Sequence, residues 1–273
     1  MRLLSYVTLL FMLVLSLKAK SSYVFVPLPM KNKEKTMEEF LPLVNYINRT
    51  TLPLTYTYKK DYEDILRGFK EQNIDIAYLG PLPYALLVKE YPYVRPIITL
   101  KPAKKKKNGY RCVLAKFTED TLPKNRPLKV ALTQPDSTCG YFMTSKLLQK
   151  SYGLLLLEQN YTYTMSHSNA LLEVLKGNYD IAGASDTIAQ KFESLGMQII
   201  ASSEKLPSFA IVVNTKTISQ EDVKKLQKSI LSVPQEQYEN WGTLLKYGFD
   251  VAPSNLFSDM QIDEVIPQKG NYR

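Results

Sequence analysis

The feature that most constrains the fold is a repeated alternation of short apolar segments with amphipathic helical patterns. This alternation predicts an α/β fold with a mostly parallel sheet. Ligands bind such sheets beyond the carboxyl ends of the strands, so the loops after Pro27, Tyr58 and Leu79 are expected to line a site. Strands are predicted at residues 23–27, 54–58, 74–79, 94–100, 110–116, 128–133, 161–165, 179–184, 197–202 and 209–214.

Two distant segments resemble each other and indicate an internal repeat. Residues 73–80 are Asn-Ile-Asp-Ile-Ala-Tyr-Leu-Gly, and residues 178–184 are Asn-Tyr-Asp-Ile-Ala-Gly-Ala. A helical pattern precedes and follows each segment. Two similar α/β units predict two lobes with a cleft between them.

Residues 134–141, Gln-Pro-Asp-Ser-Thr-Cys-Gly-Tyr, lie between a predicted strand and a predicted helix. A helix N-terminus carries unpaired backbone N–H groups and the positive end of the helix dipole. Small side chains let an anion approach those groups, and hydroxyls add further donors. The segment therefore predicts a site for a phosphate-like oxyanion. The alternative is an ordinary helix cap made by Ser137 or Thr138.

The first residues have the pattern of an export signal. Arg2 supplies a positive charge, residues 3–17 are mostly apolar, and cleavage is predicted after Ala19. A signal peptide at 1–19 predicts an exported, soluble, periplasmic protein, and an uncleaved membrane anchor is the alternative. No cysteine lies near the cleavage point, so a lipid anchor is not expected.

The charge and the cysteines limit the remaining classes. The net charge is +9, and the run at 104–107 is all lysine, which is typical of a solvated loop or of a surface that draws anions toward a cleft. Nucleic acid is not expected as a partner, because export separates the two and no aromatic-basic repeat is present. Export permits a disulfide between Cys112 and Cys139, but the sequence does not decide whether they are within reach.

The chain contains a set of short motifs in a characteristic order. They are Asp61-Tyr62, residues 75–82, Gly109-Tyr110, residues 136–141, residues 167–170, residues 177–180 and Asp186. In this order and spacing the chain resembles the phosphonate-binding family of ABC-importer substrate-binding proteins, over nearly the whole mature chain.

The resemblance implies a two-lobed, Venus-flytrap fold of the type 2 periplasmic-binding-protein class. Lobe 1 would comprise residues 20–112 and 209–273, and lobe 2 residues 113–208. Two hinge crossover strands are expected near 110–116 and 210–214. If Tyr110 faces the cleft, Cys112 faces the same side, and a disulfide there would tie the hinge to the anion loop.

The resemblance also implies the ligand-binding residues. They are Tyr62, Tyr110, Ser137, Thr138, Cys139, Gly140, His167 and Asp186. Cys139 replaces the last serine of the family's anion loop, which exchanges a good hydroxyl donor for a weak one. Phe209 stands near the position where aminophosphonate binders carry an acid, so no amino-bearing ligand is expected. The resemblance leaves the identity of the ligand open between phosphonate, phosphite, phosphate and another small oxyanion.

The leading interpretation is a monomeric solute-binding protein that delivers its oxyanion to the membrane permease of an ABC importer. A sensor of the same fold, which signals to a membrane histidine kinase, is the first alternative. A thiol enzyme is the alternative from a different class, with Cys139 as the nucleophile and His167 as its base. The leading interpretation involves no catalysis, no metal and no cofactor.

Overall fold

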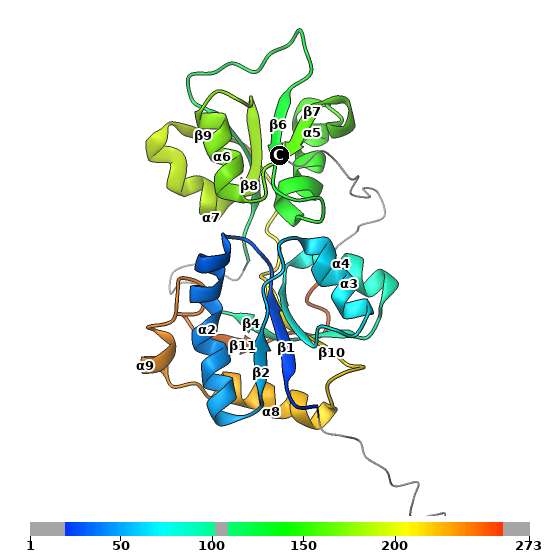
Figure 1. The fold of residues 1–273 in the computed structure, drawn as a ribbon. Helices are drawn as coiled ribbons and strands as arrows, with labels where there is room; N and C mark the ends of the chain where they lie inside the picture. Colours follow the sequence, from blue (N-terminus) through cyan, green and yellow to red (C-terminus); the bar gives the residue numbers. More distant parts are fainter. Residues whose placement is uncertain (1–19, 102–108, 259–273) are drawn as a thin grey trace, which may run out of the picture.

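The computed structural model describes residues 20–101 and 109–258, which fold into two lobes (Figure 1). Each lobe is built on one β-sheet with helices on both faces, which confirms the predicted two-lobed α/β fold. The predicted signal peptide at 1–19 and the lysine run at 104–107 lie outside the described residues. Within the described ranges, no helix is both long and apolar enough to cross a lipid bilayer.

The sheet of the first lobe, called lobe 1, has six strands in the order β11-β4-β10-β3-β1-β2. These strands are β1 (Tyr23–Pro27), β2 (Leu54–Tyr56), β3 (Ile76–Leu79), β4 (Val94–Leu100), β10 (Ala210–Asn214) and β11 (Phe249–Val251). β1 pairs in parallel with β2 and β3, whereas β10 runs antiparallel to β3 and β4. Apolar side chains of α2 (Lys33–Thr50) and α8 (Gln220–Leu231) cover one face, and those of α3 (Tyr62–Lys70) and α4 (Pro81–Glu90) cover the other.

The sheet of the second lobe, called lobe 2, has five strands in the order β7-β6-β8-β5-β9. These strands are β5 (Cys112–Phe117), β6 (Lys129–Leu132), β7 (Asn160–Tyr163), β8 (Ile181–Ser185) and β9 (Met197–Ser202). β6 pairs in parallel with β7 and β8, and β5 runs antiparallel to β8 and β9. α5 (Met143–Tyr152) packs on one face, and α6 (His167–Leu175) and α7 (Asp186–Ala189) pack on the other.

The internal repeat occupies equivalent places in the two sheets. The repeated segments end in β3 and β8, and each of these strands lies between a parallel strand and the antiparallel strand that follows a crossing. The aspartate of each repeat has the same role. Asp75 accepts hydrogen bonds from a backbone N–H of β1 at 2.7 Å and from Lys20 at 2.6 Å. Asp180 accepts from the first N–H of β6 at 2.7 Å and from Arg126 at 2.7 Å.

The chain passes between the lobes twice, and the two crossing segments pair with each other. The backbone N–H of Tyr110 donates to the carbonyl of Leu206 at 3.1 Å, and the N–H of Leu206 donates back at 2.8 Å. These crossings lie just before β5 and β10, the strands expected at the hinge. The residue boundaries of the lobes stay a prediction.

Side-chain caps fix where the helices near the cleft begin. Asp61 accepts a hydrogen bond from the N–H of Asp64 at 2.9 Å, and Ser166 accepts one from the N–H of Asn169 at 3.2 Å. These caps start α3 and α6 one residue later, at Tyr62 and His167. Two predicted site residues are therefore the first residues of capped helices.

Candidate functional site

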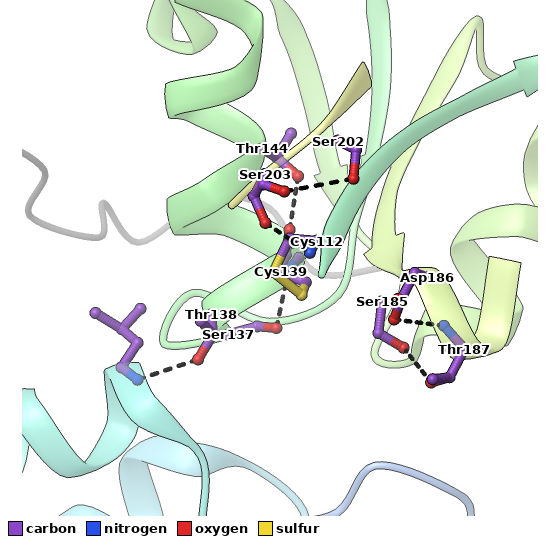
Figure 2. The surroundings of a disulfide bond; sticks show 12 residues. Cys112, Ser137, Thr138, Cys139, Thr144, Ser185, Asp186, Thr187, Ser202 and Ser203 are labelled. Atoms are coloured by element: carbon purple, nitrogen blue, oxygen red, sulfur yellow. Dashed lines mark hydrogen bonds between the residues drawn. A yellow bond between two sulfur atoms is a disulfide. The ribbon is translucent and has the colours of Figure 1, made fainter. Parts of the chain in front are cut away.

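The predicted anion loop lies at the surface of lobe 2 that faces lobe 1 (Figure 2). After β6 the chain turns into one π-helical turn, η1 (Thr138–Phe142), which leads into α5. Ser137 caps this turn, because its hydroxyl accepts a hydrogen bond from the N–H of Gly140 at 3.0 Å. Ser137 thus acts as a helix cap, and this N–H is occupied in the present conformation.

Close packing against the neighbouring strands holds the loop in place. A Cβ atom added at Gly140 would lie 1.8 Å from Oγ1 of Thr133, so only glycine fits there. A Cβ added at Gly183 in β8 would lie 1.8 Å from Oγ1 of Thr144. That Thr144 hydroxyl donates to the carbonyl of Cys139 at 2.7 Å. The loop backbone therefore has little freedom relative to the sheet.

Cys112 and Cys139 form a disulfide with a Cα–Cα distance of 4.9 Å (Figure 2). Cys112 also exchanges hydrogen bonds with Ser203, next to the second crossing: its N–H donates to the Ser203 hydroxyl at 2.9 Å. The bridge ties the anion loop to the start of β5, as one of the open alternatives expected. A disulfide sulfur has no hydrogen, so the Cys139 side chain is not the weak donor that the sequence predicted.

The disulfide also removes the thiol on which the enzyme alternative depends. The nucleophile of a cysteine enzyme is a thiolate, and neither cysteine of this chain is free. The prediction of a nucleophilic Cys139 activated by His167 is therefore wrong for the oxidised protein.

Two helices of lobe 1 point their N-termini at the anion loop. The N–H of Tyr62, at the start of α3, donates to Oε1 of Gln134 at 3.1 Å. The N–H of Leu82, in the first turn of α4, donates to Oγ1 of Thr138 at 3.1 Å. Three helix N-termini from two lobes thus converge at one place, each with backbone donors and the positive end of a dipole. Gln134 and the N–H of Leu82 were not assigned roles from the sequence, although the loop after Leu79 was expected to line the site.

Two predicted tyrosines lie in this region and keep their protons at neutral pH. Burial raises the pKa of Tyr62, and the nearby carboxylate of Asp136 raises it further. Burial also raises the pKa of Tyr110; the nearby Thr138 hydroxyl opposes this rise, and Tyr62 and Asp186 add to it. The buried Oη of Tyr110 has no hydrogen bond of normal geometry among the described residues. Both phenols are therefore neutral hydrogen-bond donors.

His167 is held against lobe 2 as a neutral imidazole. Burial lowers its pKa from 6.5 to about 4, although a hydrogen bond with the backbone of Gly183 acts in the opposite direction. Its Nδ1 atom is buried and has no hydrogen-bond partner within the described part of the chain. With this lowered pKa, the imidazole of His167 is uncharged at neutral pH in this conformation.

Asp186 is the first residue of α7 and not its cap, which is Ser185. Its N–H donates to the carbonyl of Arg111 at 2.9 Å, and its Oδ1 accepts from the N–H of Thr187 at 2.7 Å. Asp186 and Tyr110 line the same open pocket. The structure thus places the predicted carboxylate beside the predicted tyrosine of the first crossing.

An aromatic stack borders the site on the side of β10. The ring of Phe209 lies 5.4 Å from the ring of Tyr78 and 5.5 Å from the ring of Tyr110, measured between centroids. A Cβ added at Gly80 would lie 2.8 Å from the Phe209 ring, so glycine permits this close approach. Tyr78 was not predicted as a site residue. Because Phe209 fills this side with carbon, an ammonium group has no carboxylate partner from that residue.

The two lobes, their paired crossings and the site between them define a type 2 periplasmic-binding-protein fold. One solved structure of this fold is PhnD1 from Prochlorococcus marinus in complex with methylphosphonate, with a TM-score of 0.73 and 13% identity; the match covers 88% of this chain and 96% of that chain. Another is a binding-protein component of an ABC phosphonate transporter from Pseudomonas aeruginosa, with a TM-score of 0.71 and 17% identity, over 88% and 84% of the two chains.

Residues 25–252 match the family described as the periplasmic phosphonate substrate-binding protein of ABC transporters. The chain belongs to this family. A relative in Mycolicibacterium smegmatis, the phosphate-import protein PhnD, is 23% identical over 176 residues. That match covers 60% of this chain and 55% of the relative.

Proposed function

We propose that this protein binds a small phosphorus oxyanion in the periplasm and delivers it to the membrane permease of an ABC importer. Family membership supports this role and favours a permease over a sensor kinase as the partner. The observation that carries the choice of ligand is the convergence of three helix N-termini on residues 134–138. Phosphate groups bind helix N-termini through backbone N–H groups and the helix dipole.

The ligand would take over donors that the two lobes now share. Its oxygens would accept from the N–H groups of Tyr62 and Leu82, in place of Gln134 and Thr138. The hydroxyls of Ser137, Thr138 and Tyr110 would add donors. Each charge-assisted hydrogen bond contributes about 1.5–3 kcal/mol. A few such bonds suffice for micromolar affinity, which corresponds to about −8 kcal/mol.

Asp186 would select a protonated oxyanion. A carboxylate repels a dianion that offers only acceptor oxygens, but it accepts a hydrogen bond from a P–OH group. Sulfate carries no proton at neutral pH, so its contact with Asp186 would be repulsive. The selection would work through an unfavourable contact with the wrong anion as well as a favourable one with the right anion.

Closure of the lobes would couple binding to transport. The open form exposes the donors of both lobes to water, and an oxyanion that contacts both lobes stabilises the closed form. The closed form dries the site and strengthens each hydrogen bond. The permease would then distinguish loaded from empty protein by its closed shape.

The test is a calorimetric titration of the chain without residues 1–19 against phosphate, phosphite, methylphosphonate and sulfate. We expect one phosphorus oxyanion to bind with a Kd in the micromolar range or below, and sulfate to bind at least about tenfold more weakly. The proposal would be contradicted if none of the four anions gave binding heat, or if sulfate bound with the same affinity as the phosphorus oxyanion.

A further inference from the structure

We infer that the site takes phosphonates whose substituent carries a second anionic group, and that Arg111 and Lys205 select it. This inference rests on the proposed function and names a ligand class within it. It starts from an open pocket of about 540 Å³ beside the candidate site. The pocket is lined by Gly109, Tyr110, Arg111, Asp186, Thr187, Gln190 and Lys205.

The pocket shares two lining residues with the candidate site, and we place the substituent of the ligand on this side. Tyr110 and Asp186 belong to both, and the Asp186 charge lies close enough to raise the pKa of Tyr110. The opposite side is filled by the stack of Phe209 against Tyr78 and Tyr110, with Gly80 packed on the Phe209 ring. A group bonded to phosphorus would therefore extend past Tyr110 and Asp186, away from β10.

The two cations of the pocket are positioned by the crossing segments. A guanidinium N–H of Arg111 donates to the carbonyl of Ser203 at 2.6 Å, which fixes its direction. Lys205 packs its aliphatic chain over Gly109, where an added Cβ would lie 3.1 Å from Cε of the lysine. Within the described residues, neither Arg111 nor Lys205 forms an ion pair.

The charge balance of the pocket favours an anion over an ammonium group. Two cations and one carboxylate line the pocket, and Asp186 already accepts a hydrogen bond from the N–H of Thr187. Thr187 and Gln190 add neutral polar groups at the rim. A carboxylate on the substituent would be attracted by the positive charges of Arg111 and Lys205, whereas an ammonium group would be repelled by them. The pocket thus distinguishes two phosphonates that share the same phosphorus group.

The test compares three ligands by calorimetry at low ionic strength: methylphosphonate, phosphonoacetate and 2-aminoethylphosphonate. We expect phosphonoacetate to bind about tenfold more tightly than methylphosphonate, and 2-aminoethylphosphonate to bind more weakly than either. Each exposed cation contributes only a modest factor to the affinity for an anion. Lys205→Gln is therefore expected to reduce the preference for phosphonoacetate over methylphosphonate about threefold. The pair Lys205→Gln with Arg111→Gln is expected to abolish the preference.

Lys224→Gln is the matched control, because Lys224 is an exposed lysine of α8 in lobe 1 and its loss changes the net charge equally. It is expected to leave the ratio of the two Kd values unchanged. If methylphosphonate binds but phosphonoacetate has no advantage, the inference is wrong and the proposed function stands. An advantage that survives in both Lys205→Gln and the double variant also overturns it. If no phosphorus oxyanion binds, the proposed function fails together with the inference.

Discussion

Removal of the Cys112–Cys139 disulfide is expected to destabilise the protein by about 3.5 kcal/mol at 25 °C. The bridge joins residues that are 27 positions apart. A cross-link of that span reduces the conformational entropy of the unfolded chain, and the chain-entropy relation gives the stated magnitude. Both cysteine residues are buried, at 0% and 2% exposure, so the reductant acts on the unfolded chain rather than on the folded one.

Equilibrium unfolding in urea, with and without reductant, is the appropriate assay. We expect the reductant to lower the free energy of unfolding of the wild type to that of Cys112→Ala with Cys139→Ala. The double variant itself should not respond to reductant, which controls for effects of the reductant elsewhere. Equal stability of the oxidised and reduced wild type, or two free thiols in the denatured oxidised chain, would refute the reasoning.

Three further predictions concern His167, Glu39 and Gly140. His167 has a pKa of about 4 in the folded protein against 6.5 ordinarily, so the unfolded chain binds more protons between these values. Stability should therefore fall as pH drops from about 6.5 to about 4, by up to about 3 kcal/mol, and His167→Gln should flatten this part of a urea-stability profile. Glu39→Gln should destabilise lobe 1 by about 1–3 kcal/mol in urea unfolding, because one carboxylate oxygen accepts from the N–H of Leu244 and the other from Lys31 and Thr243, whereas an amide has a single acceptor oxygen and no charge; Glu38→Gln at an exposed position should have no such effect. Gly140→Ala should lower stability by about 1–3 kcal/mol through overpacking and weaken methylphosphonate binding in calorimetry; an unchanged midpoint and Kd would contradict the packing of this loop.

The internal repeat made the architecture predictable. Asp75 and Asp180 stand at the same place in two similar segments, and each accepts a backbone N–H of the adjacent parallel strand. A buried strand preceded by such an aspartate is a local pattern, so it can be recognised from the sequence alone. The starts of α3 and α8 were predictable for the same reason, because Asp61 and Ser219 cap within four residues.

Elements that depend on distant partners were not predictable. Thr36 and Glu39 have the spacing of a capping box, but α2 begins earlier, with Asn32 as its cap. The Glu39 carboxylate instead binds Lys31 and Thr243, the latter at 3.0 Å. The sequence of residues 235–247, taken alone, predicts a helix.

That segment is helical only in α9 (Gln235–Tyr238), and β11 joins the lobe 1 sheet after it. Gly242 and Gly248 have positive φ angles of 25° and 89°, which interrupt a helix. Contacts with α2 and β4 decide this conformation, and neither is visible in the local sequence.

The sequence indicated which candidate residues would meet between the lobes, but not the hydrogen bonds that connect them. The family motifs gave Tyr62, Tyr110, Thr138 and Asp186, and the structure brings these residues to the interface of the lobes. The hydrogen bonds of Tyr62 with Gln134 and of Leu82 with Thr138 join residues more than fifty positions apart. Such pairings depend on how the lobes meet, which no local pattern records.

The measurement that tests the central claim most directly is the calorimetric titration of Thr138→Val beside the wild type, with methylphosphonate and phosphate as ligands. Valine keeps the shape of Thr138 but removes the hydroxyl at which the two lobes meet. The account predicts that the variant folds normally and binds the preferred ligand at least about tenfold more weakly, while Thr50→Val, at an exposed position on α2, binds like the wild type. Wild-type affinity in Thr138→Val would contradict an oxyanion site between the lobes.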